Sequence, residues 1–234
     1  MESLARQSGS TREKILDVAS GIFAEKGYRG TTVAQICRLA KVNIASVNYH
    51  FGSKEALYQE AWRHAHALLI NRFPPDGGIA PDAPAQQRLE GRIRATLQRA
   101  LSEDAAEFRF MRNEMANPTG LLRQVIQDTI RPLRQSLHEI LTQLLGNGAD
   151  ARTIELCEMS VIGPLLQIMR RQRVQSHDGL APLFTEDRLE DMVKHFTTFT
   201  LAGIDGIRQR LVNQAPQPPS RSGGRPRSTP RKFS

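Results

Sequence analysis

The chain has 234 residues, a formal net charge of +8 and a hydrophobic content of 39%. This length fits one or two domains. No apolar run approaches the ~20 residues of a membrane-spanning helix, and no apolar segment followed by a small-residue cleavage site marks a secretory signal. We therefore expect a cytoplasmic protein that does not enter a membrane.

The positive charge is concentrated at the two ends of the chain. Residues 1–72 contain ten Lys and Arg against six Asp and Glu, residues 213–234 contain five against none, and residues 73–212 are almost neutral. A basic end suits a polyanion binder, because neutralising phosphates releases their counterions. A neutral, apolar middle suits a domain that packs, dimerises or binds a ligand.

The first predicted helix starts with a capping box, Ser10 followed three residues later by Glu13. Residues 1–9 before it are polar and are expected to be loose, and Gly27 is expected to end the helix. One face of the helix is apolar at helical spacing: Ile15, Ala19, Ile22 and Phe23.

Residues 31–57 predict two short helices joined by a tight turn, followed by a new helix start. Thr31 is expected to cap the first of them, whose buried face is predicted to consist of Val33, Ile36, Leu39 and Ala40. Asn43 is expected to cap the second helix, which runs from Ile44 to Phe51. Val47 and Phe51 are four residues apart and face inward.

The outer faces of that second helix combine small and polar side chains with one aromatic ring: Ala45, Ser46, Asn48, Tyr49 and His50. Such a surface suits a helix that enters the major groove of DNA. From the pattern alone, a purely structural helical hairpin is an equal alternative.

Beyond Gly52, Ser53 is expected to cap a fourth helix that ends near Arg72, and residues 74–84 form a linker rich in Pro and Gly. The remaining pattern is helical: 86–101, 103–115, 121–145, 151–173 and 185–211. Pro132 is expected to kink or divide the third of these segments. The sequence therefore predicts an all-α chain without strands.

Catalytic and metal-binding patterns are missing from the sequence. It contains no HExxH, CxxC or Gly-rich phosphate loop, and His64 and His66 are two apart, so they point to different helix faces. Cys37 and Cys157 are far apart in apolar helical contexts and are expected to be reduced, buried thiols. We expect no enzyme, no cofactor and no metal.

Residues 11–58 resemble the DNA-binding domain of the TetR (tetracycline repressor-like) family of bacterial regulators. The resemblance rests on four pieces at the family's spacing: Phe23–Tyr28, Thr31–Val33, Tyr49–Phe51 and Ser53–Leu57. Residues 43–58 are similar to a branch of that family typified by CecR-like regulators, as are, more weakly, Phe110–Met115, Asn117–Thr119 and Ile130–Leu133.

The resemblance implies an N-terminal helix-turn-helix domain and a C-terminal helical domain for ligand binding and dimerisation. We place the first at residues 10–58, with its fourth helix continuing to about 72, and the second at 84–211. Residues 213–234 are rich in Pro, Ser, Gly and Arg and are expected to form a disordered basic tail.

The family pattern also implies which residues meet DNA. Tyr49 and His50 are expected near phosphates, and Ser46 and Asn48 at base edges, because an amide can read adenine. Thr31, Thr32 and Lys54 resemble the family's phosphate clamps, and Ala45 completes the contacting face. The chain departs from many members at Ile44, where a basic residue is usual, and at Asn48, where an aromatic is usual.

A palindromic operator mirrors a protein dimer, so the resemblance implies a homodimer in which the last two long helices form a four-helix bundle. The predicted seam residues are Leu156, Met159, Ile162, Leu166, Phe196, Phe199 and Ile204. The alternative for each is the core of the monomer.

The resemblance further implies an inducer pocket enclosed by the fifth to eighth helices. Its predicted lining is Phe108, Met111, Arg112, Met115 and Leu122, with Arg112 or Glu114 as polar anchor. The alternative for these residues is again core packing.

We therefore predict a nucleoid-associated dimeric repressor that a small apolar or amphiphilic molecule releases from a palindromic operator. Its partners would be operator DNA, a second copy of itself and the unknown inducer. The alternative is an architectural DNA-binding protein without an inducer that relies on its basic tail, where Gly224–Arg227 resembles the core of an AT-hook.

Overall fold

The computed structural model describes residues 2–102, 106–178 and 185–214, without the side chains of residues 2–10, 166, 169–178 and 186. The described part is helical and contains no strand, which confirms the predicted fold class. Its helices are α1 (Glu2–Lys26), α2 (Val33–Ala40), α3 (Ile44–Phe51), α4 (Lys54–Arg72), α5 (Ala85–Leu101), α6 (Ala106–Ala116), α7 (Arg123–Leu145), α8 (Ala151–Asp178), the short η1 (Glu186–Arg188) and α9 (Leu189–Gln214).

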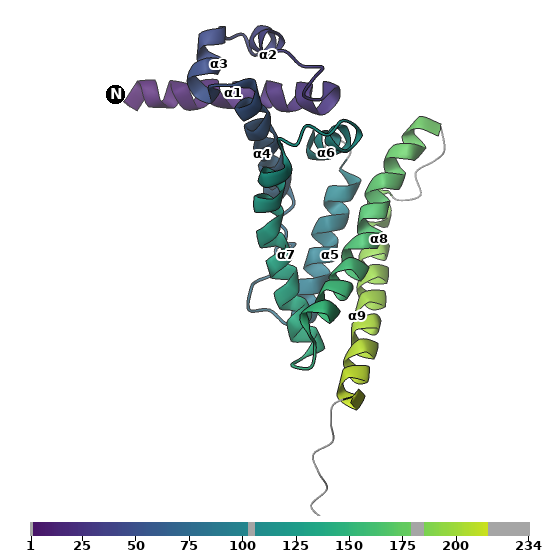
Figure 1. The fold of residues 1–234 in the computed structure, drawn as a ribbon. Coiled ribbons are helices and arrows are strands. Elements are labelled where there is room, and N and C mark those ends of the chain that lie inside the picture. The colour runs from purple at the N-terminus through teal and green to yellow at the C-terminus, as the bar shows by residue number, and fades with distance from the viewer. Residues whose placement is uncertain (1, 103–105, 179–184, 215–234) are drawn as a thin grey trace, which may run out of the picture.

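The molecule is elongated, with the short helices at one end (Figure 1). There α1 lies crosswise, α2 and α3 lie on its outer side, and α4 leads away from it. The long helices α5, α7, α8 and α9 run along the length of the molecule, and α5 packs against the other three.

Two clusters of buried side chains hold these helices together. The first cluster contains side chains from α1, α2, α3 and α4. It also includes Phe110 of α6 and, near the start of α7, Leu122 and Val125. The second joins α5, the rest of α7, α8 and α9. The segment from Phe110 to Val125 thus lies beyond the linker in sequence but packs with the N-terminal helices.

Polar contacts join α1 to α4. The Arg12 guanidinium and the Glu60 carboxylate are 2.7 Å apart, and the Ser20 hydroxyl donates to the Ala61 carbonyl at 2.9 Å. The linker in turn lies against α5 so closely that a Cβ on Gly91 would stand 2.2 Å from the Asp76 carbonyl oxygen. These contacts join α1 to α4 and the linker to α5.

Several predicted boundaries need correction. The first helix begins at Glu2 and not at the Ser10 cap, because residues 2–8 contain good helix formers and no proline. Pro132, which was predicted to kink or divide its helix, does not divide α7, and Pro164 lies inside α8. Both are exposed, so the carbonyl that each leaves without an N–H partner is on the solvent side.

The buried face of α2 also differs from the prediction at one position. Cys37 is buried beside Ile36, whereas Leu39 is exposed. The two cysteines are free and buried, as predicted. No helix among the described residues is long and apolar enough to cross a membrane, and residues 215–234, with the predicted AT-hook-like segment, lie outside the described part.

Candidate functional site

The α3 helix is held by caps at both ends and by two inward side chains. The Asn43 side chain accepts a hydrogen bond from the Ser46 backbone N–H at 2.8 Å, and Gly52 adopts a positive φ of 74° where the helix ends. Val47 and Phe51 are buried, as predicted. The helix therefore presents a fixed outer face to solvent.

That outer face consists largely of the residues predicted to meet DNA. Ala45, Asn48 and Tyr49 are exposed, and Tyr49 is 83% exposed, which is unusual for so large a ring. His50 is half-buried, with its ring centroid 5.1 Å from that of Tyr49. Ser46 is half-buried too, and its hydroxyl donates to the Asn43 side chain at 2.9 Å.

The two adjacent threonines before α2 differ from the prediction in which of them caps the helix. Thr32 caps α2 by accepting from the Gln35 N–H at 3.2 Å, and it is exposed. Thr31 is 0% exposed, and its hydroxyl donates to the Gly27 carbonyl at 2.8 Å. Thr31 therefore neither caps the helix nor offers its side chain to a phosphate, and we correct its assignment.

Lys54 at the start of α4 is held beside the α3 face by an aromatic ring. Its ammonium lies 4.2 Å from the ring centroid of Tyr28, a cation–π arrangement. The Tyr28 hydroxyl donates to the Glu55 carboxylate. This hydrogen bond, with partial burial and the charge of Glu55, raises the pKa of Tyr28 to about 12. Tyr28 thus stays neutral and positions a cation, a role that sequence reasoning missed.

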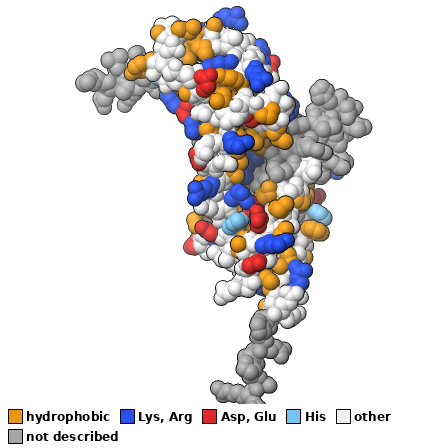
Figure 2. All heavy atoms as spheres, in the orientation of Figure 1, with side chains coloured by type: hydrophobic (Ala, Val, Ile, Leu, Met, Phe, Trp, Pro, Cys, Tyr) orange, Lys and Arg blue, Asp and Glu red, His pale blue; other side chains and the backbone are white. Residues whose placement is uncertain are grey.

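Lys and Arg side chains dot this end of the molecule (Figure 2). Arg38 and Lys41, on α2 and the turn after it, are exposed. Exposed cations beside a small, capped helix with an exposed amide can meet a phosphate backbone and base edges together.

At the other end, α8 and α9 expose large apolar side chains. Of the predicted seam residues, Leu156, Met159 and Phe199 are exposed, and Phe199 is 72% exposed. Ile162 and Phe196 are half-buried against the second core cluster. Ile204 is buried inside that cluster, so we reassign it to the core of the monomer. The side chain of Leu166 lies outside the described part.

The five predicted ligand residues do not share one environment. Arg112 and Met115 are exposed, Phe108 and Met111 are half-buried, and Leu122 is fully buried in the first core cluster. A single pocket lined by all five is therefore wrong. A hollow of about 600 Å³ lies along α7 instead, beside residues that include Ile126, Ile130, Arg131, Arg134 and His138.

Glu114, predicted as a possible ligand anchor, links α6 to α4 and to the segment before α7. Its carboxylate accepts from the Tyr58 hydroxyl of α4 at 3.2 Å and from the Thr119 backbone N–H at 2.9 Å. One residue earlier, the Asn113 side chain donates to the Ala24 carbonyl of α1 at 2.7 Å. The end of α6 is thus bonded directly to both long helices of the N-terminal region.

Sequence reasoning also missed two buried arginines on α5. Arg92 is 6% exposed and Arg99 is 9% exposed. Charged residues are rarely buried unless they are paired, so periodicity gives no warning of such positions.

Comparison with known proteins gives a consistent result. Residues 15–61 match the family described as bacterial regulatory proteins, tetR family, and residues 85–204 match the C-terminal domain of the HTH-type transcriptional dual regulator CecR. The chain is 25% identical to CecR of Shigella flexneri over 212 residues, which cover 86% of this chain and 94% of that protein.

Solved structures agree in fold. A protein described as a transcriptional regulator of Pseudomonas aeruginosa PAO1 matches with a TM-score of 0.68 and 18% identity, over 86% of this chain and 93% of that one. AibR, crystallised with isovaleryl coenzyme A and operator DNA, matches with a TM-score of 0.59 and 19% identity, over 81% and 97%.

Proposed function

Because the chain belongs to the TetR family of bacterial regulatory proteins and has a C-terminal domain of the CecR type, we propose that it is a homodimeric repressor. In this proposal it binds a palindromic operator, and a small molecule releases it. The observation that carries the DNA-binding role is the α3 face, where a capped helix exposes Asn48 and Tyr49 beside the cations of Lys41 and Lys54.

We assign the DNA contacts by chemistry. Asn48 is the base-reading residue, since its amide can donate and accept at one adenine, and Ser46 can join it if its hydroxyl leaves Asn43. Tyr49, His50 and Lys54 contact phosphates. Thr32 and Ala45 complete the face, with Thr32 at the N-terminus of α2, where the helix dipole favours an anion.

The dimer seam is assigned to the exposed sides of α8 and α9. Leu156, Met159 and Phe199 supply apolar area that the monomer leaves in water. Gly203 and Gly206 lie on α9 with open space where a Cβ would stand. Glycine inside a helix lowers the stability of that helix by about 1 kcal/mol relative to alanine. A second helix packed closely against α9 would explain these glycines, because they leave room for its backbone.

Release by a ligand needs a connection between the long helices and α3. The described contacts offer one, because α6 and the start of α7 share the first core cluster with α1–α4 and are bonded to Tyr58 and Ala24 through Glu114 and Asn113. A ligand that favours one arrangement of α6 and α7 would shift the population of DNA-binding geometries. AibR, a neighbour in fold, is a protein that binds both a small molecule and operator DNA.

The deciding experiment is selection of bound duplexes from a random DNA pool by the purified full chain at physiological salt. An inverted repeat with a fixed spacing is the expected product, since a two-fold dimer reads two half-sites. Recovery of only A·T-rich or unrelated duplexes would contradict the proposal and favour the architectural alternative. An Asn48→Ala variant, tested in the same selection, distinguishes base recognition by α3 from DNA contacts made by other parts of the protein.

A further inference from the structure

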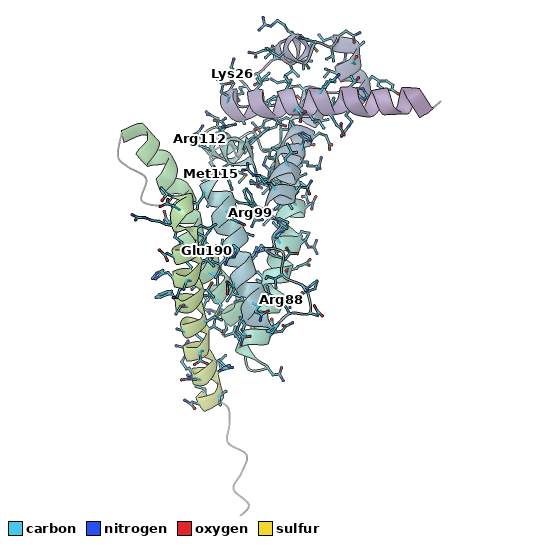
Figure 3. All side chains as sticks on the ribbon, turned by 180° about the vertical axis from the view of Figure 1, so that it is seen from behind. Lys26, Arg88, Arg99, Arg112, Met115 and Glu190 are labelled. Carbon is cyan, nitrogen blue, oxygen red and sulfur yellow. The ribbon has the colours of Figure 1, made fainter. Side chains whose placement is uncertain are left out.

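Two cations stand in the interior of the C-terminal region. Arg92 and Arg99 are seven residues apart on α5, a rise of about 10.5 Å along the same helix face, and each is more than nine-tenths buried. Thr96 lies between them, and its hydroxyl accepts from the Arg99 guanidinium at 3.2 Å. Figure 3 shows Arg99 on the upper part of α5, below α6, and Arg88 near the lower end.

Neither guanidinium has an acidic partner among the described residues. Arg92 donates to the Leu133 carbonyl of α7 at 2.7 Å, and its buried Nε atom has no acceptor in the described part of the chain. Arg99 donates to Thr96 and, at 3.5 Å, to the Phe73 carbonyl. Burial, followed by the repulsion of Arg99, lowers the pKa of Arg92 to about 10. Such burial is costly unless an anion compensates for it.

The acidic residues whose charges act on the two arginines are bonded elsewhere. They are Asp76, Glu107 and Glu158. Their carboxylates are engaged by the backbone N–H of Gly78 at 2.9 Å, by the ring of His66 at 2.9 Å, and by the side chains of Arg134 and His138 at 2.7 and 2.5 Å. Among the described residues, none of these three carboxylates forms an ion pair with either guanidinium.

We infer that α5 carries an anion site, and that the effector of this regulator is an organic anion whose carboxylate or phosphate group binds at Arg92 and Arg99. A guanidinium fork fits the oxygens of either group. Leu89, Ile93 and Leu97 of the same helix are fully buried against protein in the second core cluster, so an apolar remainder of the ligand has to displace part of this packing. The regulatory part of this inference rests on the proposed function, whereas the binding part does not.

The same contacts indicate how an anion would act on the N-terminal region. The carbonyls that now accept from the two arginines belong to Phe73, the residue that ends α4, and to Leu133 in α7. An anion that takes over these donors frees both carbonyls. Because α4 and the start of α7 are packed in the first core cluster with α3, the change reaches the DNA-binding face.

The test is thermal unfolding of the full chain without DNA, at constant ionic strength. The probes are sodium decanoate, decyl phosphate and inorganic phosphate, with decanol as the neutral control. At saturating ligand the melting temperature of the natural sequence is expected to rise by about 5 °C with at least one anion and not with decanol. Arg92→Met and Arg99→Met are expected to lose this rise. Arg94→Met, which removes an arginine paired with Glu90 and Glu190, is expected to keep it.

Arg99→Lys covers the case in which a methionine variant fails to fold, because it keeps the charge and is expected to retain part of the rise. The inference is overturned if no anion shifts the natural sequence, or if the shift is equal in all folded variants. Operator release is measured separately on the selected duplex. A shift that depends on the arginines without release leaves the anion site standing and contradicts only the regulatory role.

Discussion

Asn48 and Tyr49 stand side by side on the exposed face of α3, but they offer DNA different chemistry. The Asn48 amide can distinguish bases, because it donates and accepts hydrogen bonds at one base edge. The Tyr49 hydroxyl donates or accepts a hydrogen bond at a single atom. Asn48→Ala is therefore expected to weaken binding to the selected operator by roughly 10- to 100-fold, which corresponds to about 1–3 kcal/mol. Binding to a scrambled duplex should change little.

The measurement is fluorescence anisotropy with operator and scrambled duplexes at one salt concentration. Tyr49→Phe is the matched control, because it keeps the ring and removes the hydroxyl, and we expect it to weaken both duplexes alike. An equal loss on both duplexes for Asn48→Ala would show that Asn48 contacts the backbone and does not read a base.

Lys41 illustrates a residue where stability and DNA binding oppose each other. It ends α2 in the left-handed region, with φ of 55° and ψ of 45°, and it is the non-glycine residue with positive φ among the described residues. This conformation costs an L-residue about 1 kcal/mol, whereas glycine adopts it freely. Lys41→Gly is therefore expected to raise the free energy of unfolding by up to about 1 kcal/mol.

The same substitution removes an exposed cation near the DNA-binding face, so operator affinity should fall and its dependence on salt should become shallower. Urea unfolding measures the first effect and binding across a salt series the second. Lys41→Asn also removes the charge but keeps a residue that tolerates this conformation. A loss of stability in Lys41→Gly would contradict the argument from backbone strain.

At the scale of elements, one buried carboxylate joins α7 to α8. Glu158 is buried and accepts from the Arg134 guanidinium at 2.7 and 3.0 Å and from His138 at 2.5 Å. Burial by itself would raise the pKa of Glu158, but the hydrogen bonds and charges of Arg134 and His138 outweigh it and lower the pKa. The folded protein therefore binds this proton less tightly than the unfolded chain does.

A lowered folded pKa gives stability that is complete above the unfolded value and is lost as the pH falls through the folded value. The melting temperature of the natural sequence should thus fall as the pH is lowered below the ordinary pKa of a glutamate, and it should fall less in Glu158→Gln. Glu139→Gln, at an exposed acidic residue of α7, is the control and should follow the natural sequence. If the melting temperatures of all three proteins change equally with pH, Glu158 contributes nothing to acid sensitivity.

The sequence predicts helix caps correctly where the cap depends only on neighbouring residues. Asn43 and Ser53 cap the helices that they were predicted to cap, because a cap depends only on a side chain and the backbone three residues later. Thr31 and Thr32 share the same chemistry, so only the packing of Thr31 against the Gly27 carbonyl decides which of them caps α2.

At the scale of the whole molecule, sequence periodicity could not assign the segments after the linker to their partners. An apolar stripe predicts that Phe110 and Leu122 are buried, but not that they join the core of the N-terminal helices. For the same reason Arg92 and Arg99 could not be predicted as interior residues. Their burial depends on the close approach of α4, the linker and α7 to α5, and no local pattern encodes that approach.

Assembly is the remaining property of the whole molecule, and Phe199 gives the most direct test of it. Its ring is exposed on α9 beside a helix side with Ala202, Gly203 and Gly206, where a second copy would bury it close to the two-fold axis. Phe199→Glu would place a carboxylate from each copy in an apolar seam, which costs several kcal/mol if the charges stay unpaired.

We expect the natural sequence to be dimeric and Phe199→Glu monomeric in sedimentation velocity at micromolar concentration. The variant should keep its fold, because water already surrounds this side chain in the monomer. Met115→Glu changes an exposed apolar residue on α6, outside the proposed seam, and should leave the dimer intact. Because two half-sites are bound together only by a dimer, Phe199→Glu should also lose most of its operator affinity. A variant that stays dimeric would place the seam on another surface.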